Sequence, residues 1–497
     1  MGRHFLPTIF CTALCLVITC QLWFSNKLWG QTPFLQQEHT KDLSLKEATE
    51  MMYSNNYIIR QSAKGIEMAI AEKQKLNSSW YPFITAGGSF IHMSNDIEAK
   101  ESLTELAEPF KEALPELGQI AGTLLPILSK YGLTSLDFPL LEKNLASIDA
   151  TMVWPLFTGG KRIYANRIGK SIVTSAKLLD ITVEQSQMLQ IVERYYAAKL
   201  AREIVDVQIK NLTAMQKLYT NSRKLMENGI INKAEMLAAK VAWQEAVREL
   251  DKAKNNDSTS TEALRALIWS EDSIKLSEKH SGFNYTTPFF MCSNIPSGEY
   301  FKNSIDANNP QLQFIENQKD IAGNKFKIER SRYMPDIALF GKQNIYSYNI
   351  PENLSPRSVA GVGFAWNIFD GLNREKSMKI VKKELEILDL SNKQLKEDLH
   401  LLSDKLYYQL DDAMNNLTTI NTTIELAEEL VKIREKSLAE GMATTADVIN
   451  AHATLAKIRI AAAMAYFQYD ISLATLLSIA GMGEKFLDYR NNADIIL

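Results

Sequence analysis

The stretch from Val359 to Phe369 reads Val-Ala-Gly-Val-Gly-Phe-Ala-Trp-Asn-Ile-Phe, and its alternating side chains decide the fold class. Successive side chains of a β-strand point to opposite faces. One face would carry Ala360, Val362, Phe364, Trp366 and Ile368, and the other Val359, Gly361, Gly363, Ala365 and Asn367. Bulky apolar residues opposite small or polar ones are typical of a strand with lipid outside and a lumen inside. A water-soluble sheet packed on helices is the alternative.

Three further stretches have similar length and a noisier alternation: 82–93, 148–157 and 335–348. We therefore predict four membrane-crossing strands in two hairpins, 82–158 and 335–369. Open strand edges are not tolerated in lipid, and four strands cannot close a barrel. Several chains must then share one barrel, and strand counting alone permits a dimer or a trimer.

The chain repeats itself, since landmarks of matching type recur at two fixed offsets. Asn56 with Asn309 and Pro82 with Pro335 lie 253 residues apart, whereas Trp154 with Trp366, Phe157 with Phe369, Gly159 with Gly371 and Gly229 with Gly441 lie 212 apart. We predict a first repeat over 31–281, a connecting segment over 282–300, a second repeat over 301–481 and a C-terminal tail over 482–497. The first copy carries 41 extra residues, an inserted loop at about 94–143. This loop would lie outside the cell, either as a cap over the mouth or as a simple loop.

Long helices account for most of the remaining sequence. The chain has only 22 glycines and 14 prolines, and neither type occurs in 170–228 or 373–440. We predict long helical hairpins over 160–281 and 372–480, turning at Gly229 and Gly441. Leucines spaced by three and four residues from Leu385 to Leu406 indicate a coiled-coil seam, with a slip near Ala413. The fold class is therefore mainly α with a small β part. A structural coiled-coil protein without a pore is the alternative.

The N-terminal segment 1–30 is predicted to be a signal peptide, with Arg3 and His4 before a mostly apolar stretch. Cleavage before Cys20, as in a lipoprotein, is the alternative. Cys292 would be the only cysteine left, so no intrachain disulfide is expected. Beyond Gly30 no run of 18 apolar residues suggests a membrane helix.

Several functional classes are disfavoured by composition and motif. The net charge of −3 offers no basic excess for binding nucleic acid. The histidines are scattered, and neither a phosphate-binding loop nor a Gly-x-Ser-x-Gly nucleophile motif occurs. We therefore predict no enzymatic activity, no cofactor and no metal site.

From about Leu43 to Gly483 the sequence resembles TolC-like outer-membrane efflux proteins. The segment 154–160, Trp-Pro-Leu-Phe-Thr-Gly-Gly, is similar to the family's junction between strand and helix, and 367–372 keeps it in degenerate form. The segments 227–231 and 440–444 resemble the tips of the family's helical hairpins, and 447–451 resembles the run that follows the second tip. The order and spacing of these motifs are more specific than any one of them.

The resemblance implies a homotrimer with one shared twelve-stranded β-barrel and an α-barrel of helices. It would sit in the lipid of the outer membrane of a Gram-negative bacterium and extend into the periplasm. A periplasmic adaptor protein would dock at the tips, and an inner-membrane transporter would deliver the cargo. The chain would then be a passive duct for efflux or secretion, with a cargo that the sequence does not specify.

The resemblance also implies three groups of functional residues. A periplasmic gate would involve Asp447, Asn450 and Glu235; Asn450 stands where relatives have a second acid, which weakens the expected ring of charge. The adaptor would dock on the tips at Asn228, Gly229, Ile230, Ile231, Gly441, Met442 and Ala443. The junctions between strand and helix would use Pro82, Phe157, Gly159, Gly160, Pro335, Phe369 and Gly371. The alternatives are a partner of the helix N-terminal dipole for Asp447, ordinary packing for the tips and a purely structural role for the junctions.

Overall fold

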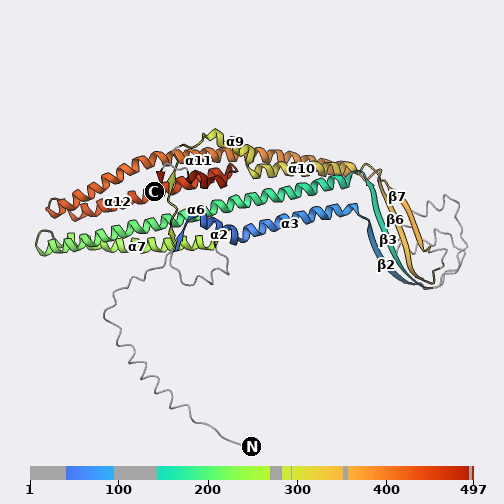
Figure 1. Cartoon of the computed structure of the whole chain (residues 1–497), viewed down its shortest axis with the longest axis horizontal. Coiled ribbons are helices and arrows are strands. Elements are labelled where there is room, and N and C mark those ends of the chain that lie inside the picture. Colours follow the sequence, from blue (N-terminus) through green and yellow to red (C-terminus); the bar gives the residue numbers. More distant parts are fainter. Residues whose placement is uncertain are drawn as a thin grey trace, which may run out of the picture.

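The computed structural model describes residues 41–94, 143–268, 283–292, 294–350, 356–491 and 495–496. The chain is an elongated rod in which long helices run side by side, with the large sheet at one end and the helical turns at the other (Figure 1). The expected signal peptide and nearly all of the expected inserted loop lie outside the described residues.

Six elements of the first half recur in the same order in the second half. The first set is α2 (Leu45–Asn55), α3 (Tyr57–Asn77), β2 (Phe83–His92), β3 (Asn144–Thr158), α6 (Lys161–Glu227) and α7 (Lys233–Ile268). The second set is α9 (Gly298–Asn308), α10 (Pro310–Ser331), β6 (Asp336–Tyr348), β7 (Ser358–Ala365), α11 (Asn373–Ala439) and α12 (Thr445–Ile479). The helices α6 and α11 each have 67 residues and are therefore about 100 Å long.

The paired asparagines of the repeat are helix caps. Asn56 Oδ1 accepts hydrogen bonds from the first free amides of α3, and Asn309 Oδ1 does the same for α10. An asparagine in extended backbone satisfies donors that a helix leaves unpaired at its start. The two residues thereby fix where one helix ends and the next begins.

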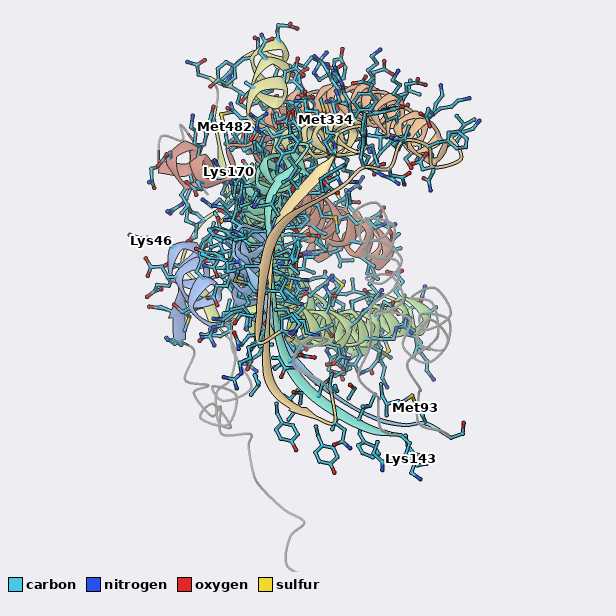
Figure 2. The ribbon with its side chains drawn as sticks, turned by 90° about the vertical axis from the view of Figure 1, so that its right-hand side faces the viewer. Lys46, Met93, Lys143, Lys170, Met334 and Met482 are labelled. Atoms are coloured by element: carbon cyan, nitrogen blue, oxygen red, sulfur yellow. The ribbon has the colours of Figure 1, made fainter. Side chains whose placement is uncertain are left out.

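The four long strands form one antiparallel sheet in the order β2-β3-β6-β7. The helices that lead into or out of these strands pack in the same order, α3 on α6, α6 on α10 and α10 on α11. Figure 2 shows the strands curving away from the helices, with Met93 and Lys143 at their far end. There the Met93 amide donates a 2.8 Å hydrogen bond to the Lys143 carbonyl, where the first hairpin leaves the described residues.

The main core lies partway along the rod, where both sets of helices meet four short strands. These are β1 (Lys41–Leu43), β4 (Phe283–Tyr285), β5 (Phe290–Met291) and β8 (Ile495–Ile496). Tyr195, which is fully buried, donates to the Leu43 carbonyl at 2.8 Å and accepts from the Thr287 amide at 2.9 Å. The short helices η2 (Gly483–Lys485) and α13 (Phe486–Asn491) also pack here, with Phe486 only 1% exposed. Much of the predicted tail is therefore part of the core.

The coiled-coil seam of α11 runs on without the slip predicted near Ala413. Its buried residues advance by four and three positions through Leu399, Ser403, Leu406, Leu410, Ala413 and Leu417. The prediction was wrong because it counted mainly leucines and passed over Ser403, a small residue that is fully buried in the seam.

Among the described helices, α12 has a length and apolar composition that would allow it to span a membrane, which the sequence analysis did not anticipate. However, 56% of its apolar window is buried inside the chain. Such burial is typical of a core helix.

Candidate functional site

One face of the large sheet is apolar across all four strands. Ile84 lies opposite Met152, and Leu339 opposite Val362, so these side chains share a face. Ile84, Val362 and Phe364 are 69%, 64% and 78% exposed, although they are large and apolar. An exposed apolar band of this extent is expected where lipid covers the surface.

The opposite face carries polar groups that are paired across the strands, next to an apolar row of Phe83, Val153 and Phe340 at its end nearer the helices. Thr85 and Thr151 share a 2.6 Å hydrogen bond, and Ser89 and Ser147 share one of 3.1 Å. Lys342 forms a 3.0 Å ion pair with Asp149. Such a face suits a water-filled lumen, because each polar group has either a partner or access to solvent.

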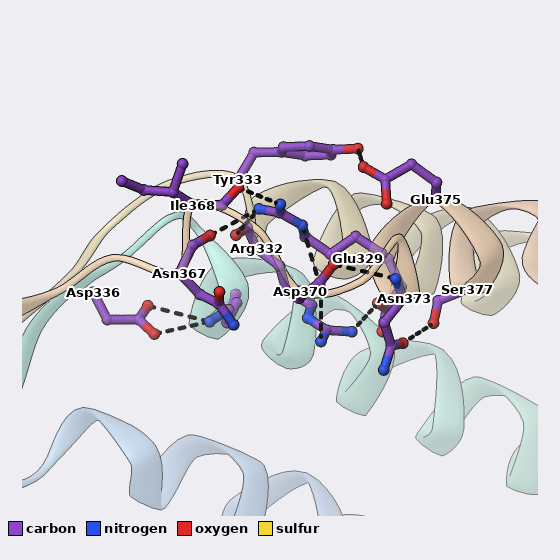
Figure 3. A network of polar contacts seen from close by, with 12 residues as sticks. Glu329, Arg332, Tyr333, Asp336, Asn367, Ile368, Asp370, Asn373, Glu375 and Ser377 are labelled. Carbon is purple, nitrogen blue, oxygen red and sulfur yellow. Dashed lines mark hydrogen bonds and ion pairs between the residues drawn. The ribbon is translucent and has the colours of Figure 1, made fainter.

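At the second junction between strand and helix, Arg374 at the start of α11 contacts two other segments, and Figure 3 shows its partners Tyr333, Ile368 and Asp370 close together. Its guanidinium donates to the carbonyls of Ile368 at 2.8 Å and Arg332 at 3.2 Å, and it lies 4.4 Å from the centre of the Tyr333 ring. The Trp366 indole donates to the Tyr333 carbonyl at 3.1 Å. The end of α10, the exit of β7 and the start of α11 are thereby joined. We call this arrangement the arginine clamp.

The first junction has the same clamp. Arg162 donates to the Leu156 carbonyl at 2.6 Å and lies 4.3 Å from the centre of the Trp80 ring. The Trp154 indole donates to the Trp80 carbonyl at 3.0 Å. Arg162 and Arg374 are separated by 212 residues, and Trp80 and Tyr333 by 253. The sequence analysis did not single out either arginine, although the two lie at the same 212-residue offset as the other repeated landmarks.

The two clamps differ in burial and charge. Arg374 is 4% exposed, and its Nε lies 3.4 Å from the carboxylate of Asp370, whereas Thr158 holds the equivalent place in the first copy. Asp370 also accepts from the Asn373 amide at 3.1 Å and so caps α11. At the outer side of the clamp, a 2.6 Å hydrogen bond from Tyr333 lowers the pKa of the Glu375 carboxyl and raises that of the tyrosine.

The clamp explains why β7 is shorter than the alternating pattern. The strand ends at Ala365, because the following carbonyls turn toward Arg374 and Trp366 turns its indole toward Tyr333. Pro82 and Pro335 come directly before β2 and β6, and Phe157 and Phe369 are 43% and 73% exposed beside the clamps. Any functional role of these junction residues, and of Gly160, stays a prediction.

Gly159 and Gly371, which hold equivalent places at the two junctions, offer a matched pair of substitutions. Both have positive φ, 61° for Gly159 and 69° for Gly371, so an alanine is strained at either position. A Cβ on Gly159 would also lie 2.4 Å from the Ser331 carbonyl oxygen, whereas a Cβ on Gly371 meets nothing within 4 Å. We expect Gly371→Ala to cost about 1 kcal/mol and Gly159→Ala clearly more. Equilibrium unfolding of both variants measures this, and equal losses would contradict the steric argument.

At the other end of the rod, two tight turns form the tips of the hairpins. Gly229 and Gly441 have φ of 75° and 73°, as the predicted turns require. Ile230 and Met442 are 56% and 73% exposed, while Ile231 and Ala443 are half-buried. Asn228 ends α6 with its amide bonded to the Lys224 carbonyl. Their docking role stays a prediction.

The predicted gate residues lie on the first turns of α7 and α12. The carboxylate of Asp447 accepts from the Thr444 amide at 2.9 Å and from its hydroxyl at 2.7 Å, which is a capping arrangement at the start of α12. Both hydrogen bonds lower the pKa of Asp447. Glu235 accepts from the buried Thr445 hydroxyl at 3.2 Å and so ties the first hairpin to the second. Asn450 is exposed one turn further on.

The comparisons with known proteins agree with this arrangement. Residues 303–482 match the family model described as outer membrane efflux protein. The matched stretch corresponds to the second repeat of the chain. Proteins that this family model describes are channel proteins, and the match together with the likeness to solved outer-membrane channels supports an outer-membrane location for the chain.

Among curated proteins, the alkaline protease secretion protein AprF of Pseudomonas aeruginosa is 19% identical over 312 residues. The match covers 60% of this chain and 62% of AprF, so the chain spans less than two thirds of that relative. Among solved structures, CusC has a TM-score of 0.70 at 12% identity, covering 92% of this chain and 96% of its own. The outer membrane protein VceC of Vibrio cholerae has a TM-score of 0.67 at 13% identity, covering 88% and 96%. These likenesses show the fold.

Proposed function

We propose that this chain is the outer-membrane channel of an export system that spans the periplasm. Three copies would share one twelve-stranded barrel, and their helices would continue the passage as a tunnel. A periplasmic adaptor and an inner-membrane transporter would deliver the cargo, so the channel itself would be passive and non-enzymatic. AprF is named for the secretion of a protease, and the same architecture would serve efflux or secretion.

The observation that carries this proposal is a two-faced sheet with both edges open. Within the sheet, β2 and β7 each pair on one side only. An exposed apolar face suits lipid, yet the free amides and carbonyls of an open edge do not. Pairing β2 of one copy with β7 of the next removes every edge.

The helices support the same closure. Because α3, α6, α10 and α11 pack in the order of the strands, α3 and α11 form the open sides of the helical layer. Joining the sheets of neighbouring copies would bring α11 of one beside α3 of the next. The tunnel and the barrel would therefore close together.

Planar-bilayer recording tests the proposal. We expect the purified protein to form stable aqueous channels and to cross-link as a trimer. Conductance should be absent in protein with a proline at a β2 position whose amide faces away from β3, because the open edge then loses a donor for pairing with the next copy. A protein without conductance that alkaline washing releases from membranes would instead be a structural coiled-coil protein without a pore.

The gate gives a pH-dependent prediction. We propose that Asp447, repeated in three copies, favours cations at the periplasmic entrance. Because hydrogen bonds from Thr444 lower its pKa, the carboxylate stays charged as the pH falls through the ordinary aspartate range. The stability that Asp447 contributes by capping α12 is likewise fully present above the pKa that this aspartate has in the unfolded chain. It is lost only as the pH falls through the lowered pKa of the folded chain. We expect cation selectivity to persist to more acidic pH than in Thr444→Val, where one of the hydrogen bonds is missing. Reversal potentials measure this, and Asp447→Asn should abolish the selectivity at all pH values.

A further inference from the structure

The start of α11, beside the membrane strands, carries an unusual concentration of positive charge. Lys376, Lys379, Lys382 and Lys383 are all exposed, and we call them the lysine patch. Between Asn373 and Lys383 the only acid is Glu375, which is already bonded to Tyr333. Basic side chains are disfavoured in the first turns of a helix by the helix dipole. Helix stability therefore does not account for the patch.

Two of the four lysines are free to bind an anion. Lys383 pairs with Glu386, and Lys382 lies 5.7 Å from the centre of the Phe326 ring. Within the described part of the chain, neither Lys376 nor Lys379 has a carboxylate at ion-pair distance. Lys376, Lys379 and Lys383 line an open groove of about 670 Å³, whose other lining residues are Glu384 and the apolar Ile380, Ile387 and Leu388, so the lysines lie beside an apolar surface.

The residues just before the patch are apolar and exposed. Ile368, Phe369 and Leu372 are 72%, 73% and 52% exposed and lie between the end of β7 and the lysines. Trp366 lies just past the end of β7, and its indole is bonded to the backbone at the clamp. From the strands toward the helices, the surface therefore changes from apolar to aromatic to positive. That is the sequence of environments in one leaflet of a membrane.

The open side of a neighbouring copy does not complement this charge. The other open side of the helical layer, α3, carries four basic residues, Arg60, Lys64, Lys73 and Lys75, against two acids, Glu67 and Glu72. The two acids already pair with Lys64 and Lys75. A second copy placed against the patch would add further positive charge. An anion is thus a better fit than protein alone.

We propose that the lysine patch binds the headgroups of anionic phospholipids in the periplasmic leaflet of the outer membrane. The phosphate would lie on Lys376 and Lys379, and the acyl chains would extend along Ile368, Phe369 and Leu372 toward the strands. Clustered lysines beside a membrane segment attract anionic lipid by roughly 1 kcal/mol for each charge near the surface. The site would fix the depth of the channel in the membrane. This inference rests on the outer-membrane location and is independent of conduction.

The test compares lipid retention by two variants of equal charge. The first replaces all four patch lysines by glutamine, and the matched control replaces Lys224, Lys233, Lys432 and Lys436, which are exposed near the tips. Protein is reconstituted in vesicles of phosphatidylcholine with phosphatidylglycerol, extracted, and its bound lipid counted by native mass spectrometry. We expect the patch variant to bind phosphatidylglycerol roughly tenfold or more weakly, and the control to bind it like the parent protein.

Further outcomes keep the inference falsifiable. Replacing the four lysines by arginine should restore binding, because the charge is retained; this also shows that loss in the glutamine variant is not misfolding. Equal retention in the patch variant and the control would overturn the proposal. Trimers that dissociate in the patch variant with unchanged lipid binding would assign the lysines to the contact between copies instead. If channels are absent while selective lipid binding remains, the proposed function fails and this inference stands.

Discussion

Arg374→Ala is expected to lower the free energy of unfolding by about 3 kcal/mol. The substitution removes hydrogen bonds to the carbonyls of Asn367 and Ile368 and leaves Asp370 with only the more exposed Arg332, 3.5 Å away, as a cationic partner. A buried carboxylate that loses its partner costs far more than an exposed one. Because the clamp joins α10, β7 and α11, the loss should loosen the connection between sheet and helices. Equilibrium unfolding in detergent measures the effect.

Arg162→Ala is the matched control, since it breaks the equivalent clamp in the first repeat of the same chain. Arg162 is less buried and has no carboxylate equivalent to Asp370, so we expect a loss nearer 1 kcal/mol. Arg374→Lys should be intermediate, because an ammonium cannot reach several carbonyls with a rigid fork. Equal losses at Arg374 and Arg162 would show that burial and the Asp370 pair are unimportant.

The mainly helical fold with a small strand part could be predicted because its signals are local and long. Helices of 67 residues leave a gap in glycine and proline, and strands with a lipid face alternate in side-chain size. The order of strands in the sheet was not predicted. It depends on β3 pairing with β6, a contact between the two repeats of one chain that no local sequence pattern reveals.

The candidate site was predicted unevenly for a related reason. Gly229 and Gly441 were found because left-handed turns demand glycine, and structural positions of this kind can be recognised in sequence. The clamp arginines were missed because their partners are backbone carbonyls, which leave no trace in side-chain identity. The contact of Glu235 with Thr445 was also missed, since it joins residues 210 positions apart.

That contact makes Glu235→Ala the most informative change at the tips. Glu235 joins the start of α7 to the start of α12, and beneath it Ala239 and Val448, 0% and 1% exposed, belong to one small core shared by both hairpins. Removing the carboxylate leaves the buried Thr445 hydroxyl without its acceptor. A hydrogen bond to a charged group contributes about 1.5–3 kcal/mol, and 1.4 kcal/mol is tenfold in an equilibrium.

We therefore expect Glu235→Ala to separate the two hairpin tips at least tenfold more often. Amide hydrogen exchange in the first turns of α7 and α12 should accelerate by that factor, while exchange near the arginine clamps stays unchanged. If the tips form the periplasmic gate, single-channel conductance should also rise. Glu235→Gln keeps an acceptor oxygen and should resemble the parent protein more closely than the alanine variant does. Unchanged exchange in Glu235→Ala would mean that the small apolar core around Val448, and not the hydrogen bond, holds the tips together.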